Sequence, residues 1–217
     1  MAALDQAGAV QLRLRERKKA RTRASIQQHA MRLFRAQGYQ TTTVEQIAAA
    51  AEVSPSTFFR YFATKEDVVL RDDYDRLMLE AFRAQPPEVS PIRAVRAAIR
   101  QLGSVLEGLT PEELALEQER AALQLSVPEI RARWLDESVR AFREFAQVVA
   151  DRVGSQPEAL PVRTFVGASL GAMLGVYLAL IDGDPPTGSE TLKWYGMADL
   201  TRTMDEALAL LEAGLPL

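Results

Sequence analysis

The sequence predicts an all-α protein of about nine helices. Three observations lead to this prediction. Apolar residues recur at the three- and four-residue spacing of an amphipathic helix in almost every segment. No segment shows the alternating pattern and the tight-turn dipeptides that mark β-hairpins. Proline, serine, threonine and glycine recur at intervals where helices are expected to begin or end.

The first predicted helix covers residues 22–37, and Gly38 follows it, where a helix end favours a left-handed residue. Thr43 is the expected N-cap of a second, shorter helix. After a turn of a few residues, Ser54 is the expected N-cap of a third helix. Pro55 stands at the first position of that helix, where a missing N–H group costs nothing.

The remaining helices follow from the same signals. Thr64 and Asp67 form the expected capping box of a fourth helix, which should run to about Gln85. Five further helices are predicted, and they cover residues 90–109, 110–125, 128–153, 159–181 and 189–213.

Composition is that of an ordinary globular protein, with 47% hydrophobic and 25% charged residues among 217. There is no cysteine, which excludes disulfides and thiolate metal sites, and there is a single histidine. We therefore expect no metal and no cofactor. The N-terminus lacks a basic start followed by an apolar stretch, so it does not resemble a secretory signal, and we expect a cytoplasmic protein.

The stretch "VSPSTFFRYFATKED" gives one short helix both an apolar and a polar face. A helix, a short turn and a second short helix at residues 43–62 have the arrangement of a helix-turn-helix. Apolar side chains would hold the second helix at a fixed angle, and they are Ile47, Val53, Phe58 and Phe62. Ser56, Thr57 and Arg60 would then face outward, where they suit base edges and phosphates.

Charge is distributed unevenly along the chain. Residues 1–65 contain eleven Lys/Arg and four Asp/Glu, a net charge of +7, whereas the remaining residues have a net charge of −10. A basic end on an acidic body predicts that the first 65 residues meet a polyanion. The run "RLRERKKARTR" at residues 13–23 is either a solvated extension of the first helix or an arm that binds the DNA backbone or minor groove.

The 47 residues "RTRASIQQHAMRLFRAQGYQTTTVEQIAAAAEVSPSTFFRYFATKED" resemble the DNA-binding domain of the TetR family of transcriptional regulators. The matching positions are Thr22, Ile26, Ala30, Leu33, Phe34, Gly38, Tyr39, Thr42, Thr43, Val44, Ile47, Ala48, Val53, Ser54, Thr57, Phe58, Tyr61, Phe62 and Lys65. The resemblance implies a DNA-binding domain at residues 11–66 and a ligand-binding and dimerisation domain at residues 67–217. It also implies a homodimeric repressor that leaves a palindromic double-stranded operator when a small apolar ligand binds.

The resemblance also identifies positions that contact DNA. The third predicted helix, which begins after Ser54, is the recognition helix. Its outward-facing residues and the positions from the resemblance together give the expected DNA-binding set: Arg21, Thr22, Thr42, Thr43, Ser54, Pro55, Ser56, Thr57, Phe59, Arg60, Tyr61 and Lys65. Two residues depart from the family pattern. Glu52 stands where members usually have Gly, at a cost of about 1 kcal/mol if the backbone there is left-handed. Phe59 stands where many members have Tyr, and without a hydroxyl it suits a thymine methyl or a sugar.

The apolar stretch at residues 164–181 has two interpretations. It is near the lower length limit of a membrane span, with glycines four residues apart, but polar residues dilute it and no basic cluster flanks it. A helix buried on all sides fits better, and we expect it to form the dimer interface together with residues 189–213. The interface set is Gly167, Gly171, Gly175, Leu170 and Leu174.

Two groups of residues are candidates for ligand binding. Arg93, Arg96 and Arg100 follow one side of a helix and are either a solvated face or the mouth of a pocket for an anion. Aromatic and apolar residues are either plain core or the lining of a pocket, which the family resemblance requires. They are Trp134, Phe142, Phe145, Phe165, Met173 and Tyr177. A ligand that combines both groups is an acyl-CoA.

Other functions remain open from the sequence. A helical enzyme would need a nucleophile or an acid–base set, and none stands out. An architectural DNA-binding protein would lack a ligand pocket. A membrane-tethered regulator would use the apolar stretch as an anchor. We expect a ligand-responsive DNA-binding regulator that is not an enzyme and does not enter a membrane.

Overall fold

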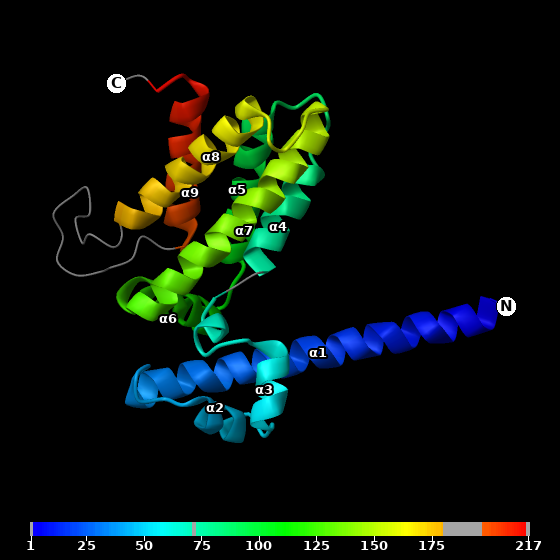
Figure 1. The fold of residues 1–217 in the computed structure, drawn as a ribbon, viewed down its shortest axis with the longest axis vertical. Coiled ribbons are helices and arrows are strands. Elements are labelled where there is room, and N and C mark those ends of the chain that lie inside the picture. The colour runs from blue at the N-terminus through cyan, green and yellow to red at the C-terminus, as the bar shows by residue number, and fades with distance from the viewer. Residues whose placement is uncertain (1, 71–72, 180–196, 216–217) are drawn as a thin grey trace. The chain divides into compact units, whose positions relative to one another are not determined.

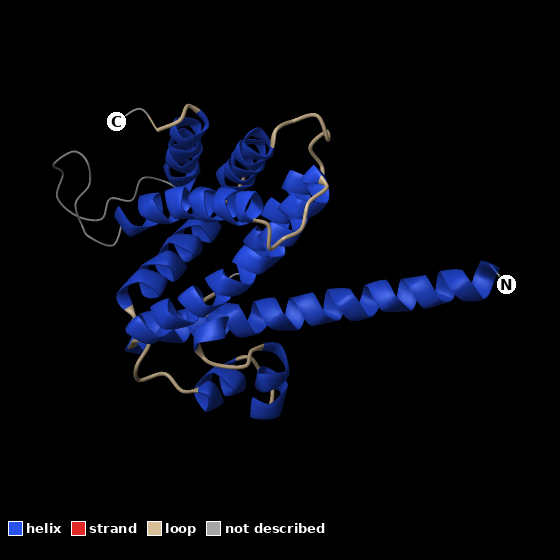
Figure 2. Cartoon of the chain, turned by 45° about the horizontal axis from the view of Figure 1, so that its top comes forward, coloured by secondary structure: helices blue, strands red, loops and turns tan. Residues whose placement is uncertain are grey.

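The chain folds into helices joined by turns, as the sequence predicts (Figures 1 and 2). The computed structural model describes residues 2–70, 73–179 and 197–215, and within them there are nine α-helices, one 3-10 helix and no strand. They are α1 (Ala2–Gln37), α2 (Val44–Ala50), α3 (Pro55–Tyr61), η1 (Glu66–Val68), α4 (Asp73–Arg83), α5 (Pro91–Glu107), α6 (Pro111–Ser126), α7 (Pro128–Val153), α8 (Leu160–Ala179) and α9 (Met197–Glu212). The helices form two compact units, Met1–Leu70 and Arg71–Leu217.

In the first unit, α1 packs against α2 and η1, and α2 packs against α3. Each element contributes apolar side chains to a shared core, which are Ile26, Ala30, Met31, Phe34, Ile47, Ala48, Phe58, Phe62 and Val68. Phe58 is fully buried, and its ring centroid lies 5.7 Å from that of Phe62. Burying one such aromatic side chain contributes about 1.5–3 kcal/mol, so these contacts fix the position of α3.

The turn between α2 and α3 is a helix-ending motif with two hydrogen bonds. The N–H of Val53 donates to Ala48 O at 2.9 Å, and the N–H of Glu52 donates to Ala49 O at 3.1 Å. This is the Schellman arrangement, which requires a left-handed residue just after the helix. Glu52 has that conformation, with φ of 55°. The departure from glycine therefore has a real backbone cost, of about 1 kcal/mol.

Two helix boundaries differ from the prediction. Residues 22–37 are only the last part of α1, which begins at Ala2. Thr22 does not cap the helix, because its hydroxyl donates to Lys18 O at 3.0 Å inside it. The preceding residues are mostly good helix formers, so nothing in them ends the helix.

The helix expected from Thr64 to about Gln85 is interrupted. Its capping box does form, with Thr64 N donating to Asp67 Oδ2 at 3.0 Å and Asp67 N to Thr64 Oγ1 at 3.3 Å. The chain then makes the tighter 3-10 turn of η1, in which Val69 N donates to Glu66 O. Leu70 is not helical, and the next α-helix that the structure describes is α4, from Asp73.

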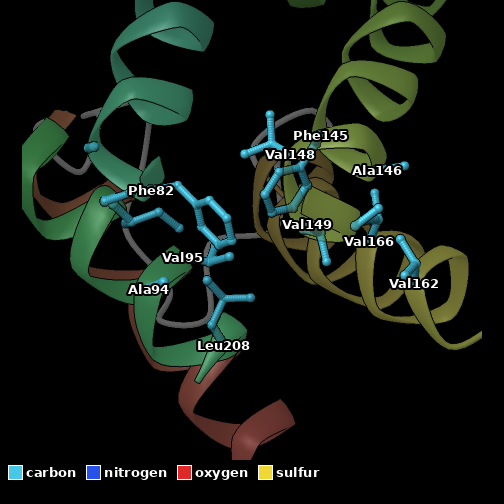
Figure 3. Packing of buried hydrophobic residues seen from close by; sticks show 14 residues of the cluster. Phe82, Ala94, Val95, Phe145, Ala146, Val148, Val149, Val162, Val166 and Leu208 are labelled. Atoms are coloured by element: carbon cyan, nitrogen blue, oxygen red, sulfur yellow. The ribbon is translucent and has the colours of Figure 1, made fainter. Parts of the chain in front are cut away.

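In the second unit, α5 packs between α4 and α9, while α8 packs between α7 and α9. Buried side chains from all five helices form one core (Figure 3), to which α4 contributes Phe82, α5 Val95 and α9 Leu208. Phe82 meets Phe145 of α7 edge to face, with 5.3 Å between ring centroids. The core therefore joins the first and last helices of the unit.

One glycine permits the close approach of α5 and α9. A Cβ atom on Gly103 would lie 2.7 Å from Thr201 Oγ1, closer than packed atoms allow. Arg152 of α7 lies against the connection between α4 and α5, where its guanidinium donates to Gln85 O at 3.1 Å and to Val89 O at 2.7 Å. These contacts hold the turn between α4 and α5.

The expectation that α8 is buried on all sides is wrong for a single chain. Val162, Val166 and Ser169 are buried, but Gly171 and Gly175 are exposed. By length and composition alone, the stretch from Leu160 to Tyr177 could also cross a membrane, and only a small share of it is buried within the chain. Most residues on every side of α8 are apolar, but the described part of the chain buries only the side with Val162, Val166 and Ser169.

Candidate nucleic-acid interface

The N-terminus of α3 carries a connected set of hydroxyl groups. Ser54 Oγ accepts from Thr57 N at 3.1 Å and so caps the helix. The same oxygen lies 2.8 Å from Ser56 Oγ and donates to Thr57 Oγ1 at 3.0 Å. Ser54, Pro55 and Ser56 are all exposed. The polar end of the helix is therefore ordered before any partner binds, which lowers the entropy cost of binding.

Phe59 is the unusual residue on this surface, because 53% of it is exposed. The Phe59 ring packs edge to face against the buried Phe58 ring, with 5.4 Å between the two centroids. Arg60 beside it is exposed, and its guanidinium lies 5.4 Å from the Tyr61 ring centroid. The outer side of α3 thus presents a fixed apolar ring next to a cation, a combination suited to base edges and sugars.

Arg23 of α1 holds the other end of α3, a role that sequence analysis missed. Its guanidinium donates to Tyr61 O at 3.1 Å and lies 4.5 Å from the Phe62 ring centroid. A cation at a helix C-terminus satisfies a carbonyl that has no partner within the helix. The signal was available, since Arg23 stands three residues before the buried Ile26, on the same side of α1.

Lys65 lies half-buried beneath the loop between α1 and α2. Its Nζ donates to Tyr39 O and to Thr42 O, both at 3.0 Å, and lies 4.0 Å from the Tyr39 ring centroid. The Tyr39 hydroxyl in turn donates to Glu66. Burial alone would raise the pKa of Glu66, but the hydrogen bond from Tyr39 and its other hydrogen bonds outweigh burial and lower it. Lys65 is therefore a fixed cation with one N–H left over.

The predicted residues on α1 and α2 are divided between surface and interior. Thr43 is exposed and caps α2 in a capping box with Gln46. Arg21 is exposed and Thr22 is half-buried. Thr42 does not fit the predicted DNA contact, because it is 1% exposed and its hydroxyl donates to Gly38 O at 2.7 Å. It was placed in the set by resemblance alone, whereas packing puts it inside the unit.

The row of arginines on α5 is occupied by carboxylates of α9. Arg93 Nε lies 2.7 Å from Glu212 Oε1, and Arg96 Nε lies 2.8 Å from Asp205 Oδ1. Arg100 also reaches Asp205, at 3.0 Å. Burial would raise the pKa of Asp205, but hydrogen bonds from Arg96 and Arg100 outweigh it and lower the pKa. An anionic ligand would have to compete with these carboxylates.

The candidate pocket residues lie in two groups. Phe145 is in the core, while Phe142, Phe165 and Met173 pack against it. Trp134 and Tyr177 instead form a separate pair, with 5.0 Å between ring centroids and 40° between ring planes. Burial raises the pKa of Tyr177. The pair joins α7 and α8.

Sequence analysis also missed polar groups buried in the second unit. Glu117 and Arg120 of α6 are both buried, with 3.9 Å between Oε1 and Nε. Ser169 of α8 is fully buried, and its hydroxyl has no hydrogen-bond partner among the described residues. Charged residues on a helix normally indicate its solvated face, so the pattern alone could not identify these.

The predicted interface residues of α8 are accessible in the chain. Gly167, Gly171 and Gly175 are exposed, and Leu170 and Leu174 are half-buried. A Cβ atom on Gly171 or Gly175 would meet nothing within 4 Å. A second helix can therefore approach the backbone of α8 closely along this side.

Comparison with known proteins gives two family matches in tandem. Residues 26–71 match the family described as bacterial regulatory proteins, tetR family. Residues 89–216, more than half of the chain, match the MftR C-terminal domain of TetR-type regulators. The HTH-type transcriptional regulator TcmR of Streptomyces glaucescens is 41% identical over 145 residues. That match spans 65% of this chain and 64% of TcmR, a little under two thirds of its length.

Two solved structures share the fold. A TetR-family transcriptional regulator from Mesorhizobium loti has a TM-score of 0.51 at 20% identity, covering 90% of this chain and 97% of its own. NalD of Pseudomonas aeruginosa, the secondary repressor of the MexAB-OprM multidrug efflux pump, has a TM-score of 0.51 at 16% identity, with 90% and 97% covered. Together with the helix-turn-helix and the tandem family matches, they lead to one conclusion: the chain belongs to the TetR family of transcriptional regulators.

Proposed function

We propose that this chain is a dimeric, ligand-responsive repressor that binds a palindromic DNA operator through α3 and acts in the cytoplasm. The observation that carries the proposal is the outer side of α3, where ordered hydroxyls, an exposed cation and an exposed ring lie together. An exposed Phe in a polar surface favours a partner that covers it. The major groove of DNA offers such a partner, with thymine methyl groups beside hydrogen-bonding edges.

The first prediction concerns base recognition by Phe59. An operator is selected from random duplexes, and each thymine in it is replaced singly by deoxyuridine, which lacks only the 5-methyl group. We expect the wild-type protein to lose about fourfold in affinity at one thymine per half-site, since burying one methyl group contributes about 0.8 kcal/mol. Phe59→Ala should bind both duplexes equally, as measured by fluorescence anisotropy.

The matched control for this prediction is Phe59→Tyr, which keeps the ring and should keep the sensitivity to the methyl group. Because Phe59 is exposed, neither variant should alter folding. An Ala variant that still distinguishes thymine from deoxyuridine would show that another residue contacts the methyl group. A protein that selects no sequence would contradict the proposed function itself.

The second prediction concerns Lys65, which we propose binds a phosphate with its remaining N–H. Lys65→Met removes a donor from two part-buried carbonyls, and Tyr39 O keeps only the N–H of Thr42, so the free energy of unfolding should fall by about 1–3 kcal/mol. The slope of log K against log salt should also lose about 0.9 per subunit. Arg32→Met removes one exposed charge from α1 and is the control. If Lys65→Met lowers stability but leaves the salt slope unchanged, Lys65 stabilises the fold and does not bind a phosphate.

The dimer is proposed to form through α8 and α9. The third prediction is that Gly171→Leu shifts the protein from dimer to monomer in light scattering. Nothing among the residues that the structure describes lies within 4 Å of a Cβ atom there, so the fold of one chain should be unaffected. Ala115→Leu, at an exposed position of α6, is the control. Operator affinity should fall with the dimer, because two half-sites are no longer bound together.

Two other outcomes of the dimer experiment are informative. An unchanged dimer in Gly171→Leu would place the interface elsewhere. Recovery of the wild-type protein in the membrane fraction of lysed cells would assign the exposed side of α8 to lipid instead of to a second copy.

The ligand is proposed to be a small, largely apolar molecule bound in the second unit. The aromatic side chains of α7 and α8 support an apolar ligand. A phosphate-bearing one, of which an acyl-CoA is the specific candidate, would have to displace the carboxylates of α9 from the arginines of α5. The ligand must bind more tightly to a form of the dimer in which the two α3 helices no longer fit successive major grooves. A ligand with equal affinity for both forms would not change their populations.

The fourth prediction is that long-chain acyl-CoA releases operator-bound protein, whereas free CoA does not. The measurement is loss of anisotropy of the labelled operator during titration. Arg93→Gln should weaken release by acyl-CoA if its phosphates meet the arginines. Release by an uncharged apolar alcohol with none by acyl-CoA would keep the apolar site and reject the arginines. Failure of every ligand to release DNA would favour an architectural DNA-binding protein.

A further inference from the structure

The N-terminal half of α1 is a basic helix that extends beyond the packed part of its unit (Figure 1). Among the α1 residues whose burial the structure describes, the buried ones all lie at Ile26 and beyond. Further toward the N-terminus, five cations are exposed, and they are Arg15, Arg17, Lys18, Lys19 and Arg21. The family match begins only at Ile26, so it assigns nothing to this segment.

The helical register connects these cations with the recognition helix. Arg15, Lys19 and Arg23 are spaced four residues apart, so they follow one side of α1. Arg23 on this side contacts the C-terminal end of α3. Lys19 and Arg15 therefore continue the α3 side of α1 by one and two further turns, roughly 6 Å and 12 Å along the axis.

This arrangement is unfavourable for an isolated helix. Like charges four residues apart, as at Arg15 with Lys19 and at Arg17 with Arg21, destabilise a helix by about 0.2–0.5 kcal/mol for each pair. Ordinary packing would place apolar residues on the side that faces α3, since the same side of α1 becomes buried core further along. Cations in these positions are matched instead by a partner with a dense negative charge.

We propose that this basic extension, residues 13–21, binds the DNA phosphates that flank the half-site contacted by α3. The inference rests on the proposed DNA-binding function. Residues 13–21 measure roughly 13 Å along the helix axis, at about 1.5 Å per residue. DNA carries one negative charge for about every 1.7 Å of its axis, so several phosphates lie within reach. The contact is with the backbone and adds affinity without adding sequence preference.

The test combines a protein variant with operator length. In the variant, Arg15, Arg17, Lys18 and Lys19 are all replaced by Gln, which keeps helix propensity. The control variant replaces four exposed arginines of the second unit by Gln: Arg76, Arg83, Arg140 and Arg143. Each protein is titrated against the selected operator with no flanking base pairs and with about ten on each side, roughly one further turn, at several salt concentrations. Circular dichroism confirms that each remains folded.

We expect the wild-type protein and the control variant to bind the flanked operator more tightly than the short one. The extension variant should lose this gain, and its salt slope on the flanked operator should fall by up to about 0.9 for each contact removed. On the short operator its affinity should match that of the control. Sequence preference should be the same in all three proteins.

Two results would overturn the inference. One is a wild-type affinity that does not depend on flanking DNA. The other is an extension variant whose salt slope on the flanked operator equals that of the control. Either result, obtained with a protein that still selects an operator, leaves the function of α3 intact. Failure of the wild-type protein to bind any duplex would instead reject the proposed function and this inference together.

Discussion

The position of α3 depends on the burial of Phe58 and Phe62 in the first unit. Helices α2 and α3 have seven residues each, too few to be stable in water on their own. Each is held by a side-chain N-cap at its beginning and by packing along its length, and the turn between them is closed by two backbone hydrogen bonds. The outward orientation of the recognition surface is therefore a consequence of the core behind it. A substitution that weakens this core would displace α3 and so alter its outer side, even though no residue of that surface is replaced.

Basic residues have two different roles in this structure. Arg23, Lys65 and Arg152 each donate to backbone carbonyls that terminate a helix or form a loop. These cations are part of the fold, because each satisfies an acceptor that would otherwise be left unpaired. Arg60 and the cations of the basic extension lie at the surface of the first unit. Part of the positive charge of the first unit is therefore used within the fold, and the net charge overstates the number of cations that are available to bind DNA.

The second unit combines a firmly held side with an open one. Ion pairs between α5 and α9 surround a close helix approach at Gly103, and the core reaches from α4 to α9. The exposed side of α8, in contrast, has glycines with open space above them. Helix α9 therefore has a fixed partner on α5, while α8 keeps an exposed side, which is the proposed dimer surface. The second unit also buries polar side chains, and those described are Glu117, Arg120, Ser169 and Thr201.

The sequence by itself determined the helical class, most helix boundaries and the helix-turn-helix, because caps, prolines and apolar spacing are local signals. The resemblance also drew attention to Glu52, but only the structure shows that its backbone is left-handed. The sequence could not determine which polar residues face outward. Thr42 is buried by the packing of its loop, and Lys65 is held by carbonyls that come from a distant part of the chain. Likewise, Asp205 and Glu212 meet the arginines of α5 only because α9 folds back onto it. These outcomes depend on contacts between residues far apart in the chain, and such contacts exist only once the tertiary structure has formed.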